Sequence, residues 1–273
     1  MPDGRSLDLC EVGDPEGVVA LYLHGTGSSR LEAAPYAAAA ARHGVRLIAW
    51  NRPGTGGSTI QDGRRVLDVV ADARLVAEAV TAERPVAIGL SGGGCHVLAL
   101  ASTAPDVVRA AIAINPGPPA DVAVLAEAPA MFRFLIKMAR DRPRRFARFT
   151  KGLEAEPGPL GRALQRRSLD PRDLAVMNDP ELSELFAASS AEGRQQDRAY
   201  TKEALMLWGK PWGVDLDRFA VPLHVFAGRN DPFMSFALRL GRAGADLHWF
   251  DGGHISGFAA PVADEVMALT AQS

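Results

Sequence analysis

Residues 89–93 (GLSGG) place a serine between glycines, directly after an apolar run that ends at Leu90. This spacing lets a strand turn sharply into a helix, which leaves the hydroxyl of Ser91 exposed on a strained backbone. The backbone N–H groups at the start of such a helix face the place where negative charge develops. The segment therefore predicts Ser91 as a nucleophile for a carbonyl carbon. The alternative interpretation is a glycine-rich helix cap without chemistry.

A serine hydroxyl needs a base to remove its proton. His254 follows the last predicted strand on a Gly-Gly turn. Catalytic groups in open parallel sheets gather at the carboxyl edge, so we predict His254 as the general base. The other five histidines precede a glycine loop, lie on helices or fall inside predicted strands: His24, His43, His96, His224 and His248.

The base in turn needs a carboxylate that fixes its tautomer. Asp231 follows a strand end and lies between Ser91 and His254 in the chain. Asp251 stands too close to His254 along the same turn to reach its ring easily. Asn115, at the end of another strand, cannot carry charge. We therefore predict Asp231 as the orienting acid, with a purely turn-forming Asn-Asp-Pro segment as the alternative.

Other glycine-rich and metal-binding motifs are missing. Residues 92–95 (GGGC) lack the ending of a Walker A loop, and residues 25–30 (GTGSSR) lack the last glycine of a dinucleotide-binding turn. No His-Glu-x-x-His motif is present, and Cys10 and Cys95 form neither a disulfide framework nor a Cys-x-x-Cys pair. We expect no cofactor and no metal, and we interpret Cys95 as a small apolar core residue.

The elements that must position these side chains follow from the hydrophobic pattern. Apolar runs that end in glycine-bearing turns fit strands covered on both faces, and helical patterns lie between them. This alternation predicts an α/β fold with a mostly parallel central sheet and helices on both faces. The expected strands are 18–23, 45–50, 85–90, 110–114, 221–227 and 246–250, and the expected helices are 32–43, 65–82, 95–104 and 257–270.

Strand signals vanish between residues 118 and 213, where helical stretches broken by prolines take over. We interpret residues 118–213 as a helical cap inserted into a core of residues 1–117 and 214–273. Some of its aromatic side chains should line an apolar pocket over Ser91, so we expect a small-molecule substrate with an apolar part. The candidate lining residues are Leu90, Phe132, Trp208 and Trp212.

Five segments, in chain order, resemble those of the α/β-hydrolase superfamily: residues 24–27 (HGTG), 52–58 (RPGTGGS), 89–93 (GLSGG), 228–231 (GRND) and 253–254 (GH). They span the predicted core and leave out the insertion. The resemblance implies the catalytic order Ser…Asp…His, a helical cap, and an oxyanion hole formed by the backbone N–H groups of Thr26 and Gly92. Asn51 departs from the family, which usually has Asp before the Arg-x-Gly turn.

The chain has 30 basic and 32 acidic residues and a net charge of −2 at pH 7. This balance attracts neither nucleic acid nor an anionic membrane. No apolar stretch reaches the ~20 residues that span a bilayer, and the N-terminal residues lack the pattern of a signal peptide. We expect a cytoplasmic protein with no nucleic-acid or membrane partner. The sequence does not predict its oligomeric state.

Together these residues predict a serine hydrolase that cleaves a carboxylic ester, lactone or thioester through an acyl-enzyme at Ser91. The same residues would serve an aminopeptidase, C–C bond hydrolysis, perhydrolysis, or acyl transfer and cyclisation in natural-product synthesis, and the sequence leaves these open. Two hypotheses from other classes are a non-catalytic ligand receptor on the same fold and a scaffold that acts through its arginine-rich insertion.

Overall fold

The computed structural model describes residues 3–81, 83–120, 126, 128–153 and 169–273. Within these residues a seven-stranded sheet has the order β1-β3-β2-β4-β5-β6-β7. Neighbouring strands are parallel except β1, which pairs antiparallel with β3 at one edge. The predicted mostly parallel sheet is confirmed. The strands are β1 Leu9–Gly13, β2 Val18–Leu23, β3 Val45–Trp50, β4 Val86–Leu90, β5 Ala110–Ile114, β6 Leu223–Gly228 and β7 Asp246–Phe250.

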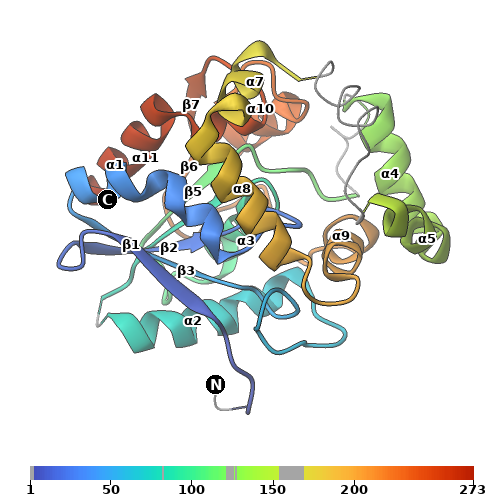
Figure 1. The fold of residues 1–273 in the computed structure, drawn as a ribbon, viewed down its shortest axis with the longest axis horizontal. Helices are drawn as coiled ribbons and strands as arrows, with labels where there is room; N and C mark the ends of the chain where they lie inside the picture. The colour runs from blue at the N-terminus through green and yellow to red at the C-terminus, as the bar shows by residue number, and fades with distance from the viewer. Residues whose placement is uncertain (1–2, 82, 121–125, 127, 154–168) are drawn as a thin grey trace.

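Helices cover both faces of the sheet, as predicted (Figure 1). One face packs against α1 (Ala37–Arg42) and α11 (Ala260–Gln272), and the other against α2 (Val69–Val80), α3 (Gly92–Thr103) and α10 (Met234–Arg242). Successive strand residues point to opposite faces, so both layers of the core are apolar. In β2, for example, Leu21 belongs to one buried cluster and Tyr22 to the other.

Several helices differ from the sequence prediction at their ends. The expected helix 32–43 is a 3-10 helix, η1 (Arg30–Tyr36), followed by the short α1, and Pro35 inside η1 lacks the N–H that a continuous α-helix would need. The expected helix 65–82 likewise starts as a 3-10 turn, η2 (Val66–Asp68), before α2. The closing helix is divided into η4 (Ile255–Phe258) and α11. The catalytic candidates keep their places at the strand ends.

Helices fill the connection between β5 and β6: α4 Ala130–Asp141, α5 Pro143–Leu153, α7 Pro171–Asn178, α8 Pro180–Gly193 and α9 Ala199–Gly209. We call these helices the insertion. Figure 1 shows α4, α5 and α9 grouped at one end of the molecule, and α7 and α8 pack against each other and against η4 and η1 respectively. Residues 121–125, 127 and 154–168 of the predicted cap lie outside the described residues. Its limits at 118 and 213 stay predictions.

Candidate active site

Ser91 stands between β4 and α3 in a backbone conformation that residues with a side chain rarely adopt, with φ 55° and ψ −117°. Its N–H donates to the carbonyl oxygen of Ile114 at 2.9 Å. The flanking glycines are sterically required: a Cβ on Gly89 would lie 2.6 Å from the backbone of Gly93, and one on Gly93 would lie 1.8 Å from the carbonyl oxygen of Leu23. The sequence therefore builds the sharp strand-to-helix turn that was predicted around Ser91.

Asp231 and His254 are joined by a hydrogen bond of 2.5 Å between His254 Nδ1 and Asp231 Oδ2. The other carboxylate oxygen, Oδ1, accepts the N–H of Phe233 at 2.7 Å. The Asp231 side chain is buried, whereas the His254 side chain is 23% exposed. With its Nδ1 proton directed at Asp231, the imidazole has Nε2 free to accept a proton.

The pKa of His254 reflects two opposing influences. Burial by itself would lower it, but the charge and hydrogen bond of Asp231, together with the charges of Asp173 and Glu32, outweigh burial and raise the pKa above its ordinary value of 6.5. A histidine with a raised pKa is a stronger base when neutral. This ring can therefore take a proton from a hydroxyl once the pH exceeds its own pKa.

Ser91 and His254 lie on the loops after β4 and β7, at the carboxyl edge of the sheet. The residue Gly257 in η4 packs against β4, because a Cβ at this position would lie 2.8 Å from Leu90 Cδ1. No hydrogen bond between the Ser91 hydroxyl and the His254 ring is present among the described residues. In unliganded sites such bonds are often long and shorten when substrate binds.

Asn115 holds the loop that carries His254, a role that sequence reasoning missed. It is buried at the end of β5, where its Nδ2 donates to the carbonyl oxygens of Gly253 (3.2 Å) and His254 (3.0 Å). Its Oδ1 accepts the N–H of Gly228 at 2.9 Å. An amide can donate and accept at once, which a carboxylate cannot do. Asn115 therefore connects the ends of β5, β6 and β7. The sequence indicated only that this residue could not be the acid.

The predicted oxyanion residues, Thr26 and Gly92, are close neighbours. A Cβ on Gly92 would lie 2.9 Å from the backbone nitrogen of Thr26. The loop that carries Thr26 is fixed by the buried Glu32, whose Oε1 accepts the N–H of Gly25 at 2.8 Å and the hydroxyl of Tyr22 at 3.0 Å. Two adjacent backbone N–H groups on a rigid loop and a helix N-terminus can stabilise an oxyanion.

A buried cluster of charged and aromatic side chains lies under the same loop. Arg52 donates to the carbonyl oxygen of His24 and forms an ion pair with Glu203 of α9. Burial alone would raise the pKa of Glu203, but Arg52 and then His96, at 3.6 Å, lower it to about 2. Burial lowers the pKa of His24 to about 3 and that of His96 to about 4, so both are neutral at pH 7.

Asn51 and Arg52 each have a polar partner in the structure. The carboxylate expected before the Arg-x-Gly turn is missing, and Asn51 Oδ1 instead accepts the N–H of Arg30 at 2.8 Å. The negative charge next to Arg52 comes from the insertion. Residues 52 and 203 are far apart in the chain and belong to no common motif, so this ion pair could not be predicted from the sequence.

A family model described as alpha/beta hydrolase fold matches residues 20–261. The chain belongs to the alpha/beta hydrolase fold family. A comparison with curated proteins finds no significant match.

Solved structures share this alpha/beta hydrolase fold over nearly the whole chain. A bromoperoxidase from Bacillus anthracis is 17% identical with a TM-score of 0.71, and 98% of this chain and 96% of that chain are covered. An esterase from Exiguobacterium antarcticum is 17% identical with a TM-score of 0.68 and coverages of 99% and 97%. The enol-lactonase from Burkholderia xenovorans LB400 is 18% identical with a TM-score of 0.66 and coverages of 99% and 96%. At these identities the likeness shows the fold alone.

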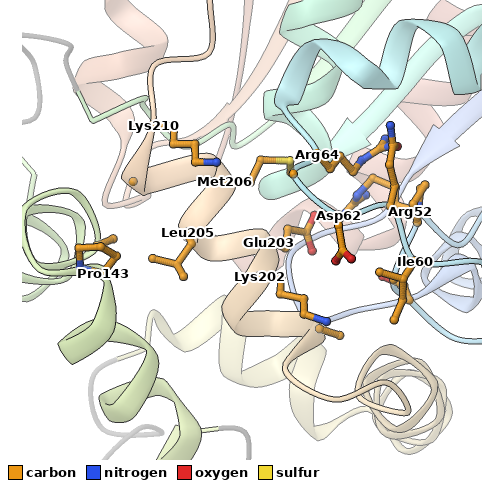
Figure 2. Close-up of a pocket in the computed structure, with 18 of the residues that line it drawn as sticks. Arg52, Ile60, Asp62, Arg64, Pro143, Lys202, Glu203, Leu205, Met206 and Lys210 are labelled. Carbon is orange, nitrogen blue, oxygen red and sulfur yellow. Dashed lines mark hydrogen bonds and ion pairs between the residues drawn. The ribbon is translucent and has the colours of Figure 1, made fainter.

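A pocket of about 340 Å³ lies between residues 52–64 and the helices α4, α5 and α9 of this alpha/beta hydrolase (Figure 2). Figure 2 shows Arg52, Asp62 and Glu203 together on one side and Pro143 across from them. Ser91 and His254 do not line this pocket. The pair of Arg52 and Glu203 is therefore shared between the pocket wall and the buried cluster under the loop that carries Thr26.

The four predicted lining residues occupy different surroundings. Phe132 of α4 packs edge-on against Phe233 at 4.8 Å between ring centroids, and Phe233 stands edge-on to His254 at 6.1 Å. Leu90 is buried in the core directly before Ser91. None of the four lines the pocket of Figure 2, and their role in substrate binding stays a prediction. Trp208 packs against Phe146, and Trp212 is buried with its Nε1 bonded to the Leu207 carbonyl.

Cys95 is unsuited to nucleophilic chemistry. Burial raises the pKa of its thiol to about 12, and Sγ donates to the carbonyl oxygen of Gly117 at 3.3 Å. Among the described residues, no group of three or more His, Cys, Asp or Glu side chains has an arrangement that would hold a metal ion. The described helices include none with the length and apolar character needed to traverse a bilayer.

Proposed function

We propose that this protein is a serine hydrolase that cleaves a carboxylic ester, lactone or thioester through an acyl-enzyme at Ser91. The observation that carries the proposal is the hydrogen bond between His254 and the buried Asp231, at the same sheet edge as a serine in a strained turn. A buried acid bonded to a ring with one free nitrogen is the arrangement that activates a serine. Two structural relatives named as an esterase and an enol-lactonase agree with this class of bond.

In the acylation step, the Ser91 oxygen forms a bond to the substrate carbonyl carbon while His254 Nε2 accepts the hydroxyl proton. The C=O electron pair moves onto the carbonyl oxygen, which accepts hydrogen bonds from the N–H groups of Thr26 and Gly92. Each such donor is worth roughly 3 kcal/mol in the transition state. The C=O bond then re-forms, the bond to the leaving alkoxide or thiolate breaks, and the leaving group takes the proton from His254.

In the deacylation step, a water molecule attacks the acyl carbon and gives its proton to His254. The same two N–H groups stabilise the second oxyanion. Collapse releases the carboxylic acid, and the proton returns from His254 to the Ser91 oxygen. Asp231 keeps the ring oriented and stabilises the imidazolium in both steps.

The surroundings of the base favour a small substrate with an apolar part. Phe233 stands beside His254, and Phe132 of the insertion packs on Phe233. Apolar walls with a few directed polar groups are typical of small-molecule sites. Short-chain and aromatic activated esters, a lactone and a thioester are therefore the first substrates to compare.

Labelling with a fluorophosphonate probe tests the proposal. We expect the wild-type protein to be labelled and to hydrolyse p-nitrophenyl esters, because an activated serine attacks both reagents. Ser91→Ala should lose labelling and nearly all turnover. Ser183→Ala, which changes an exposed serine on α8, is the matched control and should behave as wild type.

Two results would contradict the proposal. Full turnover by Ser91→Ala would exclude this serine as the nucleophile. An unlabelled wild-type protein that binds apolar esters without hydrolysing them would favour the receptor hypothesis instead.

A further inference from the structure

The first turn of α7, in the insertion, lies against the two loops that carry the acid and the base. Asp170, the N-cap of α7, accepts a hydrogen bond from Asn230 Nδ2 at 2.8 Å, and Asn230 directly precedes Asp231. Arg172 forms an ion pair of 3.3 Å with Asp251, in the loop that leads to His254. One helical turn therefore contacts both loops.

Asp173, in the same turn, is the most buried of these groups, with 2% of its surface exposed. Its Oδ1 accepts three hydrogen bonds: from the N–H of Gly253 at 3.2 Å, the N–H of Ser256 at 2.8 Å and the Ser256 hydroxyl at 2.5 Å. These donors flank His254 on both sides in the chain. The carboxylate thus fixes the backbone one residue before and two residues after the histidine.

The local sequence explains how this contact forms. Asp170 and Pro171 start α7 as N-cap and first residue, which places Asp173 in the first turn. Its side chain bonds the neighbouring loop instead of its own helix. Gly253 allows the close approach, since a Cβ there would lie 2.4 Å from Asp173 Oδ2.

We propose that Asp173 is a positioning residue of the catalytic base, so that the insertion completes the catalytic apparatus as well as covering it. This inference rests on the proposed function, in which His254 is the base. The loop around His254 contains two consecutive glycines, and a short glycine-containing loop gains little order from its own sequence. Asn115 holds the carbonyl groups of Gly253 and His254, and Asp173 holds the N–H groups of Gly253 and Ser256, so without Asp173 the loop that carries the ring loses one of its two anchors.

The charge of Asp173 acts on His254 as well. Among the described residues, the charges of Asp231 in the β6–α10 loop, Asp173 in α7 and Glu32 in η1 act on the ring, and all three raise the pKa of His254. A substitution that keeps the hydrogen bonds but removes the charge therefore separates the two effects. Asparagine does this, because its Oδ1 can still accept all three bonds.

The test compares Asp173→Ala with Asp173→Asn. Asp173→Ala should lower kcat about ten- to hundredfold, because small misplacements of a catalytic group cost that much. Asp173→Asn should retain kcat within about threefold at high pH, and the acid limb of its pH profile should move to lower pH. Asp179→Ala, which removes the exposed N-cap of α8 in the same insertion, is the matched control and should match wild type in both readouts.

A second measurement does not depend on turnover. In a Ser91→Ala background, NMR titration of the His254 imidazole, assigned by comparison with His254→Gln, should give a lower pKa in Asp173→Asn. This result would support the inference even if the wild-type protein hydrolysed no ester. Failure of the proposed function can therefore be distinguished from failure of this inference. Circular dichroism shows which variants fold, and Ser256→Ala, which removes one of the three bonds, replaces Asp173→Ala if that variant does not.

The inference is overturned if a folded Asp173→Ala retains wild-type kcat and an unchanged acid limb. It is also overturned if Asp173→Asn leaves the imidazole pKa where it was and Asp173→Ala loses activity only in step with unfolding. Either result would make Asp173 an ordinary structural residue.

Discussion

At the scale of single residues, proton transfer depends on the environment of one imidazole. His254 is mostly buried, which by itself would weaken it as a base, and three carboxylates reverse that tendency. Only the neutral ring can accept the Ser91 proton. The pKa of His254 therefore sets the pH at which the proposed reaction begins.

We predict that kcat/KM falls as the pH is lowered through the pKa of His254, with a midpoint above 6.5 because the pKa is raised. The measurement is the pH dependence of ester hydrolysis, corrected for the uncatalysed rate. A midpoint clearly below 6.5 would mean that burial outweighs the carboxylates, and it would contradict the assignment of charge around the ring.

A second residue-scale prediction concerns stability. Glu203→Gln leaves the buried Arg52 without its anionic partner, and loss of one member of a buried pair costs about 3 kcal/mol. The folded-state pKa of about 2 lies below the unfolded value of 4.5, so this contribution is complete above pH 4.5 and fades as the pH falls towards 2. Urea unfolding should show a wide gap between wild type and variant at pH 7 and a narrower one at about pH 3. A gap of equal size at both would refute the pair as its source.

At the scale of elements, the turn between β4 and α3 depends on close backbone approach. The strand end and the helix start leave no room for side chains at residues 89 and 93. The obstructing atoms at Gly93 are backbone atoms of Leu23, at the end of β2, and of His24 directly after it, so they cannot move aside without disturbing the central sheet. The turn at Ser91 and the loop after β2 therefore depend on the same close backbone contact.

We predict that Gly93→Ala destabilises the fold by more than about 3 kcal/mol, because the new methyl group overlaps the Leu23 carbonyl. Thermal and urea unfolding measure this. Gly117→Ala is the control, since the nearest atom to a Cβ there is 3.7 Å away, an ordinary contact. Equal stability of the two variants would show that the turn is less tightly packed than described.

The strands show how far local pattern determines structure. Four of the predicted strands coincide with β2, β3, β5 and β7, because buried parallel strands are continuous apolar runs bounded by glycine turns. The edge strand β1 was not predicted, since Leu9–Gly13 is mostly half-exposed and gains its pairing only from β3. Helix ends were less accurate where prolines and 3-10 turns intervene.

The residues of the candidate site also differ in how far they could be predicted from the sequence. Ser91, Asp231 and His254 could be predicted because each follows a strand end, and parallel strands bring their carboxyl ends to one edge. Asn115, Asp173 and Glu203 could not, because their contacts join distant segments after the insertion has packed. No spacing in the sequence marks such partners.

At the scale of the whole molecule, the insertion contacts the loops of the candidate site through three of its helices. Besides α7 and α9, helix α8 contacts the loop after β2: Ser189 Oγ lies 2.7 Å from Ser28 Oγ and accepts the N–H of Ser29 at 3.1 Å. Gly193 packs on the same loop, where a Cβ would lie 2.5 Å from the Ser28 carbonyl oxygen. Polar side chains of the insertion therefore form hydrogen bonds with core loops at the candidate site.

These contacts limit how freely the insertion can be exchanged for that of another protein, in evolution or by design. Replacing α4 to α9 with the corresponding helices of another member of the family would change the side chains that line the pocket. It would also remove Asp173, Ser189 and Glu203, which bond to loops of this core. We expect such a chimera to support the proposed ester hydrolysis only if Asp173, Ser189 and Glu203 are restored.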